Sequence, residues 1–134
     1  MTTKLDNHIN FVLHDKNVVG MKVEDNTVIL YIKNNLEDVE LHFKDSIAIR
    51  INNFKIGNII LNADIYEPKD LVENEDDLLY LLNIPKSNKK NTFYNKIKSQ
   101  IEDNTYKFIE INSSYGLNGF ILCKDIILRK ENKV

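Results

Sequence analysis

Cysteine is nearly absent from this sequence, because Cys123 is the only one among 134 residues. A lone cysteine excludes an intramolecular disulfide and fits a reducing compartment. The sequence also lacks any apolar run near the ~18 residues that span a bilayer. Residues 1–15 lack the continuous apolar stretch of a signal peptide. These absences predict a cytoplasmic protein that is neither exported nor inserted in a membrane.

Metal-binding and strongly charged patterns are lacking as well. His8 and His14 are six residues apart, Cys123 has no partner cysteine, and neither H-E-x-x-H nor C-x-x-C occurs. With 18 basic and 20 acidic residues the net charge is −2, which provides no general attraction to nucleic acid or anionic lipid. We therefore expect no metal, no cofactor, no membrane contact and no nucleic-acid partner.

The composition is that of a folded globular protein, with 43% hydrophobic and 28% charged residues. A chain of this length supports one core, so residues 1–134 are predicted to form a single domain. The 16 lysines against 2 arginines, with 19 asparagines and 18 isoleucines, indicate AT-rich codons and a low-GC bacterial source. Lysine and asparagine content is therefore poor evidence for function.

Residues 17–66 alternate apolar and polar side chains, the period-two pattern of half-buried strands. The pattern predicts five strands, at residues 19–24, 28–32, 39–44, 47–52 and 58–66. Asp25 and Asn26 tolerate positive φ and predict a two-residue hairpin between the first two strands. Because the connections are short, we expect an antiparallel meander over residues 17–66.

Helical spacing of apolar residues begins after Pro68. It predicts a helix over residues 75–83, and a second helix that Thr92 caps and that ends near residue 103, with the polar loop 85–91 between them. Two closing strands follow within 105–130, and the last is apolar on both faces, as in strands covered on both sides. The predicted fold is α+β, with about seven mainly antiparallel strands. Two helices, within residues 68–104, are inserted between strands five and six, and residues 1–13 form an N-terminal segment.

Two polar groups are candidates for lining a pocket between sheet and helices. A carboxylate such as Asp15 can orient an imidazole such as His14 for general base catalysis, but adjacent residues on an extended chain point to opposite faces. Ser114 and Tyr115 lie between the last two strands, where a turn is favoured over a nucleophile because G-x-S-x-G is absent. We expect Gly116 or Asn118 to supply positive φ there, and we assign no catalytic residue.

Acidic residues are concentrated at the predicted start of the first helix. The candidates for contact with a partner are Glu73, Glu75, Asp76 and Asp77. Acids at a helix start also complement the helix dipole, so a solvated helix face is the favoured interpretation. A basic partner is the functional alternative, because such a cluster steers positive charge.

Two stretches of the sequence form a further pattern, Phe11–Asp15 leading into Val18–Met21, and Ile111–Gly116 leading into Phe120–Lys124. They resemble a group of small bacterial proteins, some of which are immunity proteins of polymorphic toxin systems. The group often carries a small polar residue where this chain has Lys16. The resemblance implies a non-enzymatic protein that neutralises a toxin domain by binding it.

The leading hypothesis is therefore a cytoplasmic protein-interaction module of immunity type. One alternative is a small-molecule-binding or enzymatic domain with a pocket at His14, Asp15, Ser114 and Tyr115. Another is a self-assembling structural protein, a homo-oligomer in which an uncovered strand pairs across a two-fold axis.

Overall fold

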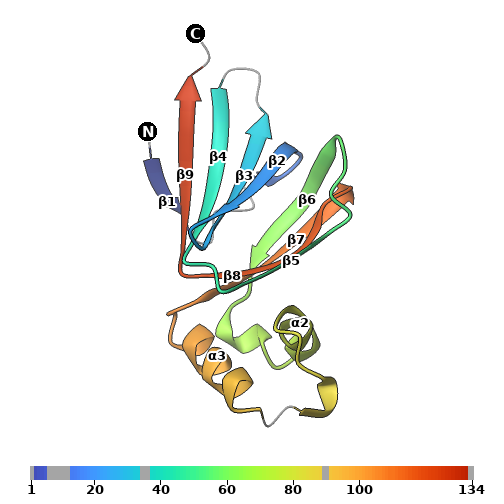
Figure 1. The fold of residues 1–134 in the computed structure, drawn as a ribbon, viewed down its shortest axis with the longest axis vertical. Helices are drawn as coiled ribbons and strands as arrows, with labels where there is room; N and C mark the ends of the chain where they lie inside the picture. Colours follow the sequence, from blue (N-terminus) through green and yellow to red (C-terminus); the bar gives the residue numbers. More distant parts are fainter. Residues whose placement is uncertain (1, 6–12, 34–36, 89–90, 133–134) are drawn as a thin grey trace.

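The computed structural model of the protein describes residues 2–5, 13–33, 37–88 and 91–132. This part of the chain forms nine strands, two α-helices and two 3₁₀ turns (Figure 1). The strands are β1 (Thr2–Leu5), β2 (Asn17–Glu24), β3 (Thr27–Lys33), β4 (Glu37–Lys44), β5 (Ala48–Asn52), β6 (Asn58–Ile65), β7 (Lys107–Tyr115), β8 (Asn118–Cys123) and β9 (Asp125–Asn132). The helical elements are η1 (Pro68–Asp70), α2 (Glu75–Leu81), η2 (Lys86–Asn88) and α3 (Thr92–Glu102).

The strands form one antiparallel sheet in the order β1-β9-β4-β3-β2-β6-β7-β8-β5. Lys124 alone separates β8 from β9, and residues 45–47 separate β4 from β5. β4 pairs with β9 and β5 pairs with β8, so the four strands form one two-stranded ribbon that bends at residues 45–47. Across the bend Lys124 N donates to Lys44 O at 3.0 Å. This bent ribbon folds the sheet into two halves.

The main core lies between the two halves of the sheet. A second core lies between the helices and the half that contains β5, β7 and β8. Figure 1 shows α2 and α3 packed beyond the half that contains β5, β7 and β8. Ile121 and Cys123 of β8 contribute to the main core, whereas Phe120 and Leu122 contribute to the helical core. β8 is therefore covered on both faces, as its continuous apolar sequence predicted.

β2 and β6 connect the halves a second time, through two residue pairs. Asn17 pairs with Ile59 and Val18 with Asn58. Asn17 and Val18 also pair with β3, and beyond a register shift between Val18 and Gly20 the rest of β2 pairs with β3 alone. Such a bulge bends a strand and increases its twist. The end of β2 therefore leaves β6 and approaches the helical side of the molecule.

The α+β class, the antiparallel pairing and the place of the helices are confirmed, whereas the strand count and the meander are corrected. The described residues contain nine strands because β1 precedes the predicted set and the last predicted strand breaks at Lys124. Of the five strands predicted within residues 17–66, only β2, β3 and β4 form a meander, since β5 pairs with β8 and β6 pairs with β2 and β7. Residues 45–47 do not form a hairpin turn between β4 and β5, because the chain continues along the bent ribbon. Period-two alternation shows which face of a strand is buried, but it does not specify the partner strand.

Local signals predict most ends of the elements. Asp25 (φ 48°) and Asn26 (φ 60°) form the predicted hairpin turn. α2 begins as expected at Glu75 and ends at Leu81, two residues earlier than expected. The cap of α3 is Asn91, not Thr92, because the Asn91 side chain accepts a hydrogen bond from Tyr94 N at 3.1 Å. Asparagine is among the strongest capping residues, and it satisfies an N–H that the first turn leaves free.

Asn58 is a fully buried polar residue that connects four segments. Its Oδ1 accepts from Lys55 N at 2.7 Å and from Leu117 N at 2.9 Å, while its Nδ2 donates to Val18 O at 3.1 Å and to Lys55 O. Gly116 (φ 89°) leaves space for this side chain, since a Cβ there would overlap Asn58 Oδ1. Positive φ is thus confirmed at Gly116, and Asn118 is not among the positive-φ residues.

Candidate functional site

His14 and Asp15 lie in a turn that is fixed to β6. Lys16 N donates to Leu13 O at 3.0 Å, and Asp15 adopts a φ of 57°. Asp15 N donates to Ile60 O at 2.8 Å, and Ile60 N donates to Lys16 O at 3.1 Å. Leu13 is fully buried beneath the turn. The backbone therefore holds both polar side chains at the surface of β6.

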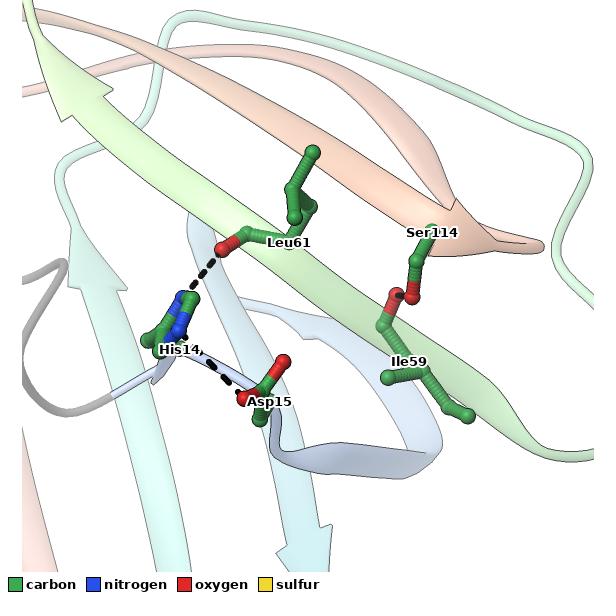
Figure 2. A network of polar contacts seen from close by, with 5 residues as sticks. All are labelled: His14, Asp15, Ile59, Leu61 and Ser114. Atoms are coloured by element: carbon green, nitrogen blue, oxygen red, sulfur yellow. Dashed lines mark hydrogen bonds and ion pairs between the residues drawn. The ribbon is translucent and has the colours of Figure 1, made fainter.

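The His14 ring contacts two acceptors. Its Nδ1 lies 2.5 Å from Leu61 O, and its Nε2 lies 3.3 Å from Asp15 Oδ2, as Figure 2 shows. The tautomer protonated at Nδ1 donates to the carbonyl. Although adjacent residues of an extended strand diverge, positive φ at Asp15 turns its carboxylate toward the ring. The structure thus brings this pair together, in an exposed position.

Ser114 and Tyr115 do not complete a catalytic arrangement with His14. Ser114 Oγ donates to Ile59 O at 3.4 Å, and Figure 2 shows Ser114 and His14 approaching β6 from its two sides. The Tyr115 side chain is exposed, with Lys55 Nζ 5.2 Å from the centroid of its ring. A serine nucleophile needs its hydroxyl within hydrogen-bond reach of the base. These contacts therefore favour a structural role for both residues.

The acidic residues at the start of α2 are mostly engaged within the molecule. Glu75 Oε1 lies 3.3 Å from Lys98 Nζ, and both side chains are partly buried. Asp76 Oδ2 lies 3.4 Å from Lys86 Nζ. Asp77 Oδ2 accepts from Tyr66 OH at 3.4 Å, whereas Glu73 is exposed. Internal pairing reduces the charge that this cluster offers to a partner.

A tyrosine and two carboxylates meet at the end of β6, a cluster that the sequence did not predict. Tyr66 OH donates to Glu110 Oε1 at 2.6 Å as well as contacting Asp77. Burial first, and then the hydrogen bond to Glu110, raises the pKa of Tyr66 above its usual value. The hydroxyl therefore stays protonated and ties β6 to β7 and α2. Among the described residues no group of three His, Cys, Asp or Glu side chains is arranged to hold a metal ion.

An apolar groove opens where the turn of β2 and β3, the start of β5 and the helices meet. We call it the corner groove, and it has a volume of about 400 Å³. Its lining residues are Val23, Asn26, Val28, Ser46, Ile47, Ala48, Ile49, Leu81, Leu82 and Phe93. Val23, Ile47 and Phe93 are 60%, 45% and 51% exposed. Exposed apolar side chains gathered around a groove are one feature of protein-interaction sites.

The corner groove was missed because its residues match the pattern of a core. Val23 and Ile47 fit the period-two alternation, and Phe93 fits the apolar face of α3. Val23 pairs with buried Val28, so it lies on the inward face of the sheet. The bulge in β2 carries it beyond the cover of β6. Exposure here depends on tertiary structure, and a sequence pattern does not report it.

The rim of the corner groove on the sheet side is acidic. Asp25 and Asp45 stand beside lining residues in the two turns, and both are exposed. Neither makes an ion pair within residues 2–5, 13–33, 37–88 and 91–132. Glu24 is neutralised by Lys22, whose Nζ lies 2.7 Å away. The groove therefore combines an apolar floor with uncompensated negative charge.

Comparison of the chain with protein-family models, with curated proteins and with solved structures found no match. Within the described residues, no helix has the length and apolar character needed to cross a membrane.

Proposed function

We propose that this protein is a protein-interaction module of immunity type, and that the corner groove is its binding surface. The carrying observation is the exposure of Val23, Ile47 and Phe93 around one groove. A volume of about 400 Å³ accommodates one or two large side chains from a partner. Such anchors at the centre of an interface supply most of the binding energy.

The proposed occupant is a protein segment with a large apolar side chain next to lysine or arginine. The apolar side chain fills the groove, and the basic side chain faces Asp25 and Asp45. Lys44 does not offset this charge, because alternation along β4 places it on the face opposite buried Phe43. Complementary charge at a rim increases association rate and selectivity more than affinity.

The proposed interface is the corner groove, whereas the sequence predicted an interface at the acidic start of α2. Glu75, Asp76 and Asp77 have partners within the molecule, whereas Asp25 and Asp45 at the groove do not pair within the described part. The α2 acids would have to give up these internal contacts in order to bind a partner protein. Asp25 and Asp45 can face a partner without losing an ion pair, and they lie beside exposed apolar side chains. The immunity role itself rests on the resemblance of two sequence segments.

The test uses a toxin domain encoded beside this gene, purified separately. We expect the protein to bind this domain and restore the growth of cells that express it. Ile47→Glu and Phe93→Glu place a charge in the groove and should weaken binding at least tenfold, with loss of protection. Ile56→Glu is the matched control, because Ile56 is 99% exposed and outside the groove.

Three results contradict the proposal. In the first, no toxin gene neighbours this one, and in the second the neighbouring domain is not bound. In the third, folded groove variants bind and protect as well as the control. An intermediate pattern, in which Asp25→Asn and Asp45→Asn slow association while Ile56→Glu does not, supports the assigned charge complementarity.

A further inference from the structure

A second cleft lies between β5 and α2, on the helical side of the sheet. It has a volume of about 290 Å³, and we call it the Arg50 cleft. Its lining residues are Arg50, Asp76, Leu79, Tyr80, Asn83, Ile84, Pro85 and Lys86. Ile84 and Pro85 provide apolar surface, Leu79 is buried behind them, and Arg50, Asp76 and Lys86 are the charged lining residues. No residue of the corner groove lines it.

Arg50 is held against an aromatic ring in this cleft. Its guanidinium carbon lies 4.2 Å from the centroid of the Tyr80 ring. Asn52, two residues along the same face of β5, donates from Nδ2 to Tyr80 OH at 3.2 Å. The Tyr80 ring also packs edge-on to Phe120, with centroids 6.3 Å apart. A stacked guanidinium has lost much of its freedom already, so binding orders it at little further cost.

The charge of Arg50 is uncompensated. Lys86 Nζ lies 3.4 Å from Asp76 Oδ2, so these two side chains neutralise each other. Arg50 makes no ion pair in the part of the chain that the structure covers. Arg50 first, and then the hydrogen bond from Asn52, lowers the pKa of Tyr80, so the positive charge of Arg50 acts on the ring beside it. The cleft therefore carries a net positive charge.

Arginine is also an uncommon choice in this chain, which has 16 lysines and 2 arginines. Lysine is a point charge on a flexible stem, whereas arginine presents a planar fork that stacks on rings and matches two oxygen atoms. The position that stacks on Tyr80 is one of the two that carries arginine. A ligand group that presents two oxygen atoms matches this fork while the guanidinium stays stacked on the ring.

We propose that the Arg50 cleft binds a small organic oxyanion, a carboxylate or a phosphate monoester on an apolar body. The guanidinium of Arg50 donates to the oxygens, and Ile84 and Pro85 contact the body. Lys86 stays paired with Asp76, so its ammonium keeps the Asp76 carboxylate from repelling the ligand. This site is independent of the corner groove and of the immunity role.

The test is a titration of the full-length, isotope-labelled protein by NMR at constant ionic strength. Benzoate, phenyl phosphate and neutral benzyl alcohol are the probes. We expect saturable shifts for one or both anions at the Arg50 side-chain N–H, Asn52 and Ile84, with benzyl alcohol at least tenfold weaker. Comparing the two anions identifies the preferred oxygen group. Binding should also raise the pKa of Tyr80, because the anion screens Arg50.

Arg50→Gln should weaken anion binding at least tenfold, and Arg50→Lys should weaken it several-fold because the stacked fork is lost. Lys96→Gln is the control, since Lys96 is exposed on α3 and outside the cleft. The spectra show whether each variant is folded. Equal binding by Arg50→Gln, equal binding of benzyl alcohol, or shifts spread over the surface lysines would overturn the proposal. Unchanged toxin binding by Arg50→Gln separates this site from the corner groove.

Discussion

Replacing Asn58 with alanine should strongly destabilise the protein, because four hydrogen bonds end on this buried side chain. The substitution removes the acceptor of Leu117 N and a donor to Val18 O, in positions that are closed to water. Each such group costs roughly 1–3 kcal/mol, and the two partly buried groups of Lys55 cost less because water can reach them. The expected loss in free energy of unfolding is about 3–5 kcal/mol. That is a large part of the roughly 5–15 kcal/mol typical of a domain.

Urea unfolding followed by circular dichroism measures this loss, since the chain has no tryptophan. Asn62→Ala is the matched control, because Asn62 lies on the same strand and its Oδ1 is buried without a hydrogen-bond partner in the described part. We expect this control to change the free energy by less than about 1 kcal/mol. A loss below about 1 kcal/mol for Asn58→Ala, or equal losses for both variants, would refute the reasoning.

Three further outcomes follow from single residues. Gly116→Ala should lower the free energy of unfolding by more than about 2 kcal/mol in chemical denaturation, because alanine is strained at positive φ and its Cβ would overlap the Asn58 oxygen. Gly57→Ala, also at positive φ but in open space, should lower it by about 1 kcal/mol. Burial raises the pKa of Cys123 from 9.0 to about 12, so above pH 9 the unfolded state loses this proton first and stability falls by about 1.4 kcal/mol per pH unit. Melting curves of the wild type and of Cys123→Ala should differ by this slope, because Tyr66, whose pKa is also raised, contributes equally to both proteins. His14→Ala should change stability by less than about 1 kcal/mol, whereas Leu13→Ala should cost about 2–5 kcal/mol, and equal melting temperatures would contradict this assignment.

The elements that the sequence predicted are those whose information is local. The Asp25-Asn26 turn, the apolar faces of both helices and the two-sided apolar pattern of β8 each depend on neighbouring residues. The cap of α3 was missed by one residue, because Asn91 and Thr92 are both capping types and only the geometry selects between them. Local chemistry therefore predicted the parts of this fold better than their arrangement.

The partners of β5 and the two clefts required the tertiary structure. Ile49 and Ile51 alternate as they would in a meander, and nothing in the pattern indicates pairing with β8 about 70 residues away. Arg50 and Tyr80 are about 30 residues apart in the sequence and meet only because α2 packs on β5. The pairing of His14 with Asp15 depends on one positive φ angle. Candidate sites in this protein therefore arise from long-range contacts.

The bent ribbon has a consequence for the order in which the chain can fold. Lys44 pairs with Asp125, so the ribbon joins residues separated by about 80 positions. While the chain is being synthesised, β4 and β5 must wait for β8 and β9, and β4 has only β3 beside it in the meantime. Long-range pairing of this kind slows folding and leaves strand edges exposed to other chains. We therefore expect the nascent protein to depend on protection from aggregation until residue 132 has emerged.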